Sequence, residues 1–266
     1  MSASDTLPLR QALHHPQLWA TQLAYLSTRL IPGQEHLEGR TYVRQRPDGA
    51  LRVDLAPDGQ ALQLRVSGGR VHADDHRRLA RLFALDEDWT AAEAALAPCP
   101  ILGPRLARQP GLRPLGCWDP FELCLRTVLG QQVTVAAANT LMARLHERAG
   151  AFTPEAILAA DLSAMGMPGK RVDTLRGLAR AVAEGRLDLE APWSVLDEGL
   201  QQLPGFGPWT RSYLAIRLGR EPDAFPASDV GLIRAAGVDS PKALLTRAEA
   251  WRPWRSLAAI YLWVLA

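Results

Sequence analysis

The chain has 266 residues, of which 47% are hydrophobic and 22% are charged, and its formal net charge is +2. This composition is that of a water-soluble folded protein, and the near balance of charges excludes a protein that binds polyanions through a basic field over its whole surface. The length allows two domains, or three small ones, with a sizeable core.

Residues 1–72 predict a small α/β domain built on an antiparallel sheet. Apolar residues at helical spacing predict one helix, which ends at Pro32-Gly33. Two segments of alternating apolar and polar residues flank the turn Pro57-Asp58-Gly59 and predict a hairpin with one buried face. In chain order the expected elements are a helix at 14–30, a strand at 41–43 and hairpin strands at 51–55 and 62–66. We identify no catalytic pattern in this domain.

Residues 73–266 predict a mostly helical domain. Acidic residues open its first two helices, where they suit the helix dipole, and Asp119-Pro120 and Thr153-Pro154 are typical pairs of a cap and a first helical residue. The stretch 98–114 is rich in proline and glycine and is predicted to be irregular. The expected helices cover residues 74–85, 88–96, 119–129, 133–149, 171–184, 193–203, 209–218, 241–250 and 254–265, with two more that start at Thr153 and Asp229.

The three cysteines, Cys99, Cys117 and Cys124, are odd in number and lack the Cys-x-x-Cys spacing of many zinc and iron–sulfur sites. We therefore expect no iron–sulfur cluster, and free thiols fit a reducing compartment. The start of the chain lacks the basic and then apolar pattern of a secretion signal, and no apolar run reaches membrane-spanning length. The sequence predicts a cytoplasmic protein without a membrane partner.

The stretch 203–210, with the sequence LPGFGPWT, lies between two apolar-periodic segments and is short enough only for a tight turn. Gly205 and Gly207 supply the backbone freedom to reverse the chain and expose its amides, and Pro208 suits the first position of a new helix. This pattern predicts a helix-hairpin-helix over about 193–218, whose amides form an anion site for a polyanion such as nucleic acid. An ordinary helix–helix connection is the alternative.

Four residues of the C-terminal part are candidates for chemistry. Asp229 stands at the start of a helix, where a capping role alone is worth about 1 kcal/mol and is the simpler explanation. Trp209 and Tyr213 share one helix face at their spacing of four residues, and Trp263 stands on the last helix. Taken alone, such aromatic residues are more often part of a core than of a ligand site.

The combination of this hairpin, the Trp209–Tyr213 pair and an aspartate about twenty residues later resembles the helix-hairpin-helix, Gly/Pro-rich, aspartate superfamily of DNA glycosylases. Within it the chain is similar to the 3-methyladenine DNA glycosylase II family. Further stretches that carry the resemblance are PGLRPLGCWDPFE (110–122), VLGQQV (128–133) and WRPWRS (251–256). The resemblance extends from about Leu79 to the C-terminus, and more weakly over the N-terminal sheet, which that family also has.

The resemblance implies an α+β fold, with an antiparallel-sheet domain before a mostly helical core of two subdomains and a DNA cleft between them. It gives Asp229 the role of the catalytic carboxylate, which stabilises positive charge on the sugar and orients or deprotonates water. Trp209, Tyr213 and Trp263 match the family's base pocket, where electron-rich rings attract a cationic alkylated purine. Val230 also matches a pocket position; this position is commonly aromatic in the family, so the pocket here is expected to be wider or less selective for cations.

Other positions are assigned by the same resemblance. Gln132 matches the wedge that fills the gap left by the flipped base, where the family often has an apolar residue. The amides of the hairpin residues Gly205, Gly207 and Thr210 are expected to bind phosphate. The family often holds a monovalent cation, Na⁺ or K⁺, on hairpin carbonyls, and the matching residues are Gln201, Leu203 and Phe206.

The scarcity of lysine indicates a subclass. Relatives that also cut the strand use a lysine amine at the start of the hairpin's second helix, where this chain has Trp209, and its two lysines, Lys170 and Lys242, lie elsewhere. The expected protein is therefore a monofunctional glycosylase for alkylated purines, without a required cofactor. It is expected to act as a monomer on double-stranded DNA and to associate with the nucleoid through it. A glycosylase for oxidised or deaminated bases, and a non-enzymatic module that binds damaged DNA, remain alternatives.

Overall fold

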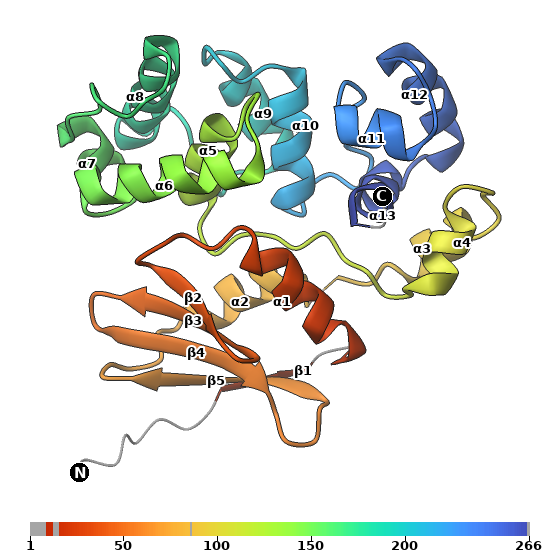
Figure 1. Cartoon of the computed structure of the whole chain (residues 1–266), viewed down its shortest axis with the longest axis horizontal. Helices are drawn as coiled ribbons and strands as arrows, with labels where there is room; N and C mark the ends of the chain where they lie inside the picture. The colour runs from red at the N-terminus through yellow and green to blue at the C-terminus, as the bar shows by residue number, and fades with distance from the viewer. Residues whose placement is uncertain (1–8, 13–15, 86, 265–266) are drawn as a thin grey trace.

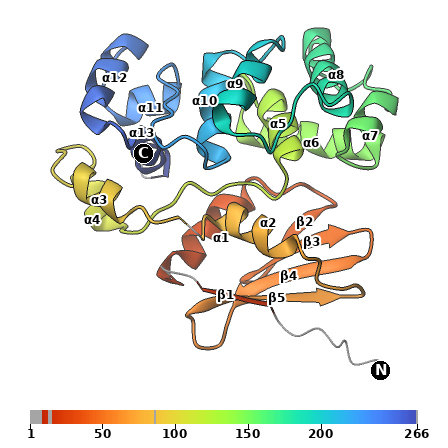
Figure 2. The ribbon, with the colours of Figure 1, turned by 180° about the vertical axis from the view of Figure 1, so that it is seen from behind.

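The computed structural model describes residues 9–12, 16–85 and 87–264. They form an antiparallel sheet beside a larger helical body (Figure 1). Helices α1 (Trp19–Ser27) and α2 (Asp75–Phe83) lie between the sheet and the helical body, and the view from behind in Figure 2 shows the same arrangement. The predicted α+β class, with a sheet region and a helical core, is confirmed.

The sheet has five strands in the order β1-β5-β4-β3-β2, and all neighbouring strands are antiparallel. Their bounds are β1 (Leu9–Ala12), β2 (Glu35–Glu38), β3 (Thr41–Arg46), β4 (Gly49–Leu55) and β5 (Ala61–Ser67). Alternation puts Leu51 and Val53 on the same buried face as Leu64, where they form one core with Trp19 of α1 and Phe83 of α2. The hairpin with one buried face is confirmed.

Some sequence expectations for this region are corrected. The edge strands β1 and β2 were not predicted; β2 has the sequence EHLE, and none of its side chains is fully buried, so no alternating pattern marks it. The helix expected at 14–30 is shorter, because a 3-10 turn at Pro16–Leu18 precedes α1; positions 14 and 15 lie outside the described residues. The domain boundary expected at residue 72 stays a prediction, although α2, beyond it, packs into the sheet core.

The rest of the described chain is helical. Its helices are α3 (Thr90–Leu96), α4 (Gly103–Arg108), α5 (Pro120–Leu129), α6 (Val135–Ala149), α7 (Pro154–Ala159), α8 (Gly169–Ala183), α9 (Trp193–Gln201), α10 (Pro208–Arg217), α11 (Val230–Ala235), α12 (Pro241–Ala248) and α13 (Arg255–Val264). Asp119 and Thr153 cap α5 and α7 through their side chains, as predicted. The stretch 98–114 was expected to be irregular, but it contains α4. Pro104 is compatible with this helix because it stands in the first turn, where a missing N–H is tolerated. Residue 265 of the last expected helix is outside the described part.

The helical body has two cores, and α10 contributes to both of them. Leu214 and Leu218 belong to the core formed with α5–α9, whereas Ala215 and Ile216 belong to the core formed with α3, α4 and α11–α13. In Figure 1, α10 accordingly lies between the two groups of helices. Among the helices in the described ranges, none combines the length and apolar character needed to cross a membrane.

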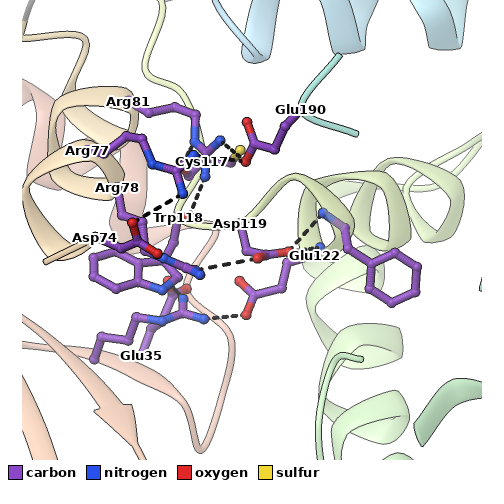
Figure 3. A network of polar contacts seen from close by, with 12 residues as sticks. Glu35, Asp74, Arg77, Arg78, Arg81, Cys117, Trp118, Asp119, Glu122 and Glu190 are labelled. Carbon is purple, nitrogen blue, oxygen red and sulfur yellow. Dashed lines mark hydrogen bonds and ion pairs between the residues drawn. The ribbon is translucent and has the colours of Figure 1, made fainter. Parts of the chain in front are cut away.

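A polar network joins the sheet region to the helical body (Figure 3). Arg44 of β3, only 3% exposed, pairs with Glu122 of α5, and Arg78 of α2 pairs with Asp119 at 3.4 Å. The Trp118 ring lies 5.2 Å from the guanidinium carbon of Arg44 and 5.5 Å from that of Arg78. These contacts fix the sheet region, and with it α1, against the helices that carry the predicted site.

Candidate active site

Asp229 is held by three N–H donors. Its Oδ1 accepts the backbone N–H of Leu232 at 2.9 Å and the indole N–H of Trp263 at 3.0 Å, while Oδ2 accepts the indole N–H of Trp209 at 3.0 Å. The capping role weighed from the sequence is real, since Asp229 is the N-cap of α11. It is not the whole role, because two further donors from distant helices, α10 and α13, fix the orientation of the carboxylate.

The aromatic residues expected at the site come together around Asp229. The rings of Trp209 and Tyr213 stack with centroids 5.3 Å apart and planes 12° apart, which confirms that they share one face of α10. Tyr213 meets Trp263 edge to face at 5.8 Å. The sequence pointed to the rings but not to the two indole N–H groups, whose partner only the fold reveals.

These residues line a cavity of about 400 Å³. Its walls come from α10 and α13, from Asp229 just before α11, from α5 and the start of α6, and from the end of α1 with the turn after it. Val230, expected as a pocket wall, does not line this cavity and is 69% exposed. As the first residue of α11 its side chain faces solvent, and the space beside Asp229 is taken by Trp209 and Trp263.

The cavity also contains residues that the sequence did not indicate. Tyr25 and Arg29 of the sheet region form part of its lining, together with Arg217 of α10. The guanidinium carbons of Arg29 and Arg217 lie 3.9 and 4.9 Å from the centroid of the Tyr25 ring. Burial acts to raise the pKa of the Tyr25 hydroxyl, but the charges of the two arginines and a hydrogen bond with Tyr213 outweigh it and lower that pKa. No local pattern in residues 25–29 could have indicated this role.

The expected wedge lies in the turn between α5 and α6. Gln132 has an exposed side chain and a φ of 57°, a left-handed conformation that non-glycine residues seldom adopt. Val133 and Val135, just after it, are 37% and 42% exposed and line the cavity. The turn therefore places an exposed polar side chain, that of Gln132, next to two partly exposed valines at the edge of the cavity.

The hairpin between α9 and α10 has the expected form. Gly205 has a φ of 90°, and a Cβ there would lie 2.7 Å from Thr174 of α8, so only glycine fits without a shift. Gly207 is the N-cap of α10 and Pro208 its first residue, which leaves the amides of the first turn, including that of Thr210, without an intrahelical acceptor. The Leu203 carbonyl accepts the Phe206 amide at 3.2 Å, which uses one of its two lone pairs.

Comparisons with known proteins identify the family of this chain. Residues 7–119 match the family described as AlkA N-terminal domain, and residues 125–255 match the HhH-GPD superfamily of base excision DNA repair proteins. The chain is 35% identical to DNA-3-methyladenine glycosylase 2 of Escherichia coli (strain K12), over 93% of this chain and 94% of that protein.

Two solved structures extend the comparison. The 3-methyladenine DNA glycosylase of Archaeoglobus fulgidus has the same fold, with a TM-score of 0.77 over 96% of this chain and 97% of that one, at 18% identity. The Schizosaccharomyces pombe 3-methyladenine DNA glycosylase, solved with abasic DNA, is 28% identical, with a TM-score of 0.56 over 65% of this chain and 95% of that one. By sequence and by fold, this chain belongs to the 3-methyladenine DNA glycosylase II family, within the helix-hairpin-helix superfamily of base excision DNA repair proteins.

Proposed function

We propose that this chain is a monofunctional DNA glycosylase of base excision repair. It flips an alkylated purine such as 3-methyladenine out of duplex DNA, hydrolyses its N-glycosidic bond and leaves an abasic site. The observation that carries the proposal is the Asp229 carboxylate, oriented by the indoles of Trp209 and Trp263 at the wall of an aromatic cavity. The E. coli relative is named for this activity.

The chemistry follows from the charge of the substrate. The bond between the sugar C1′ and the base breaks with both electrons leaving on the base, and a water oxygen then bonds to C1′ and loses its proton. An alkylated purine is already cationic, so it departs as a neutral molecule without needing a proton. The sugar becomes positive in the transition state, and a fixed carboxylate such as Asp229 stabilises that charge and orients the water.

The cavity suits a flipped base. A volume of about 400 Å³ lies in the range of small-molecule sites. The faces of Trp209, Tyr213 and Trp263 attract a cationic ring by roughly 1–2 kcal/mol each. Extrusion of a base costs a few kcal/mol and is easiest for one that is already badly paired, which adds selectivity for damage.

Strand cleavage is not part of the proposed reaction. A lyase step needs an amine nucleophile beside the sugar. Lys170 and Lys242 are both exposed and neither lines the cavity. We therefore propose that the product is an intact strand with an abasic site.

The hairpin is the proposed grip on DNA. The amides of Gly205, Gly207 and Thr210 would bind a phosphate at the N-terminus of α10. A Na⁺ or K⁺ ion on the carbonyls of Gln201, Leu203 and Phe206 would neutralise the phosphate from the same side. Gln132 would enter the stack in place of the flipped base, and one chain would act as a monomer.

A second candidate is removal of a neutral, deaminated purine. The specific observation in its favour is Arg29, whose guanidinium lies in the cavity lining and could donate to a base oxygen. The same position works against a cation, because the guanidinium of Arg29 is itself positively charged.

The proposal is tested by base release from duplexes that each carry one lesion: 3-methyladenine, 7-methylguanine, hypoxanthine or 8-oxoguanine. We expect wild type to release the methylated purines fastest and Asp229→Asn to release none of them while still binding DNA. Release of 3-methyladenine by Asp229→Asn at the wild-type rate would refute the mechanism. Absence of release from every lesion by wild type would leave only a damage-binding module.

A further inference from the structure

Gln131, next to the expected wedge, makes contacts that its sequence position does not suggest. Its side-chain amide Nε2 donates to the carbonyl of Gly205 at 2.8 Å and to the hydroxyl of Thr210 at 3.0 Å. Both acceptors belong to the hairpin region, more than seventy residues away along the chain. The two protons of the amide are therefore both used to tie the α5–α6 turn to the hairpin.

The backbone of Gln131 is held as well. Its carbonyl accepts the guanidinium N–H of Arg171 from α8 at 2.7 Å, and its amide donates to Val128 at 3.4 Å. Three elements, the α5–α6 turn, α8 and α10, thus meet at one residue. The next residue, Gln132, has the left-handed φ of 57°, a conformation that persists only where surrounding contacts impose it.

We infer that Gln131 is a positioning residue, which fixes the position of the proposed wedge, Gln132, relative to the phosphate-binding hairpin. The inference rests on the proposed function. When DNA is bound, Gln132 is in contact with the stacked bases. The hydrogen bonds of Gln131 hold the α5–α6 turn in place against these bases, because they connect the turn to the hairpin that binds the phosphate. Without these hydrogen bonds the turn moves away from the bases, so that DNA is bound with the same affinity but the base is extruded less often.

The alternative is that Gln131 only stabilises the hairpin. Thr210 is 4% exposed and its hydroxyl is the acceptor, so a weakened hairpin would also result from losing this contact. The two roles differ in the measured quantity that a mutation of Gln131 would change. A hairpin support changes the affinity for undamaged DNA, which needs no flipped base, whereas a positioning residue changes extrusion once DNA is bound.

The test uses the full chain with Gln131→Met, which keeps the length of the side chain and removes both donors without adding charge. A duplex with 2-aminopurine beside the lesion reports extrusion by its fluorescence, and single-turnover base release is followed at saturating enzyme. We expect the fluorescence change and the release rate to fall about tenfold, the equivalent of about 1.4 kcal/mol, with affinity for undamaged duplex within about twofold of wild type. The matched control Gln60→Met alters an exposed glutamine in the β4–β5 turn and should change none of the three.

Thr210→Val provides a second, independent variant. It removes one acceptor of Gln131 from the hairpin side and keeps the backbone amide of residue 210, so it decides the matter if Gln131→Met does not fold. A smaller loss in the same direction, not additive with that of Gln131→Met, is expected. Wild-type fluorescence and rate in these variants, or a loss confined to the affinity for undamaged DNA, would overturn the inference. Because fluorescence does not depend on base release, failure of the proposed chemistry would be seen separately, as extrusion without product.

Discussion

Trp263 donates its indole N–H, at 3.0 Å, to the same oxygen of Asp229 that caps α11. Helix capping and the orientation of the carboxylate therefore depend on one atom, and the first residues of α11 cannot shift without moving it. Gly231 fits this crowded corner, because a Cβ there would lie 3.0 Å from that oxygen and 3.6 Å from the Trp263 ring. Oδ2, in contrast, accepts a hydrogen bond from one donor among the described residues, Trp209, and is the oxygen with more capacity left for water or sugar.

Trp209→Phe is expected to slow base release about tenfold or more at saturating enzyme. The change removes the indole N–H that donates to Oδ2 but keeps an aromatic ring beside Tyr213, and hydrogen bonds to charged groups are worth about 1.5–3 kcal/mol. Single-turnover kinetics measure the effect, and DNA affinity should be retained. Trp254→Phe, in a tryptophan that packs edge to face on Trp89 away from Asp229, is the matched control and should keep the wild-type rate.

Gln132→Ala is expected to lower base extrusion, since it leaves a methyl group where the proposed wedge enters the stack. The measurement is the single-turnover rate together with 2-aminopurine fluorescence. Gln132→Leu should equal or exceed wild type, because an apolar side chain fills the gap with less desolvation. A wild-type rate in Gln132→Ala would remove this residue from the wedge role.

The site shows how far sequence can lead. Asp229, Trp209 and Tyr213 were singled out because their order and spacing around the hairpin resemble those of the glycosylase family, and the structure brings the three side chains together. Tyr25 and Arg29 could not, since they enter the cavity from α1 and the turn after it, about two hundred residues away in sequence, through packing of the sheet region against the helical body. The exposure of Val230 was missed for a related reason: similarity of position does not say which way the first residue of a helix points.

The fold divides in the same way. Elements with strong local signals were predicted, including the hairpin β4–β5 and the capped helices α5 and α7. β1 and β2 depend on pairing with strands that already exist, and β2 lacks an alternating pattern of its own. Edge strands of this kind are specified by tertiary context more than by their own residues.

Glu122→Gln is expected to destabilise the protein by roughly 3 kcal/mol. Arg44 is 3% exposed and pairs with Glu35 and Glu122 in the part of the chain that the structure describes. The change removes the second carboxylate and leaves Glu35 to balance that buried charge. Thermal unfolding should show Tm lowered by about 6 °C or more. Glu38→Gln, at an exposed pair with Arg52 on the sheet, is the control and should shift Tm by much less. Equal shifts of Tm in the two variants would contradict a structural role for the polar network between the sheet region and the helical body.

The cysteines should differ in reactivity. Burial raises the pKa of the Cys117 thiol to about 12 and holds that of Cys124 above its usual range, so neither forms the reactive thiolate near neutral pH. Cys99 is only partly buried. We expect iodoacetamide at pH 8 to label Cys99 first and the other two only after denaturation, as read by mass spectrometry. Rapid labelling of Cys117 in the native protein would contradict its burial.

The position of α10 in both helical cores has a consequence for how a base is captured. Leu214 and Ala215 are successive residues of α10, but they are buried in different cores. The two groups of helices, α5–α9 and α3, α4 and α11–α13, therefore cannot rotate apart unless α10 loses its contacts with one core. We therefore expect the helical body to keep its shape when DNA binds, so that the deformation occurs mainly in the nucleic acid. Discrimination then depends on how easily each stretch of duplex bends and unstacks, a property of the lesion and its neighbours before any atom of the base reaches Asp229.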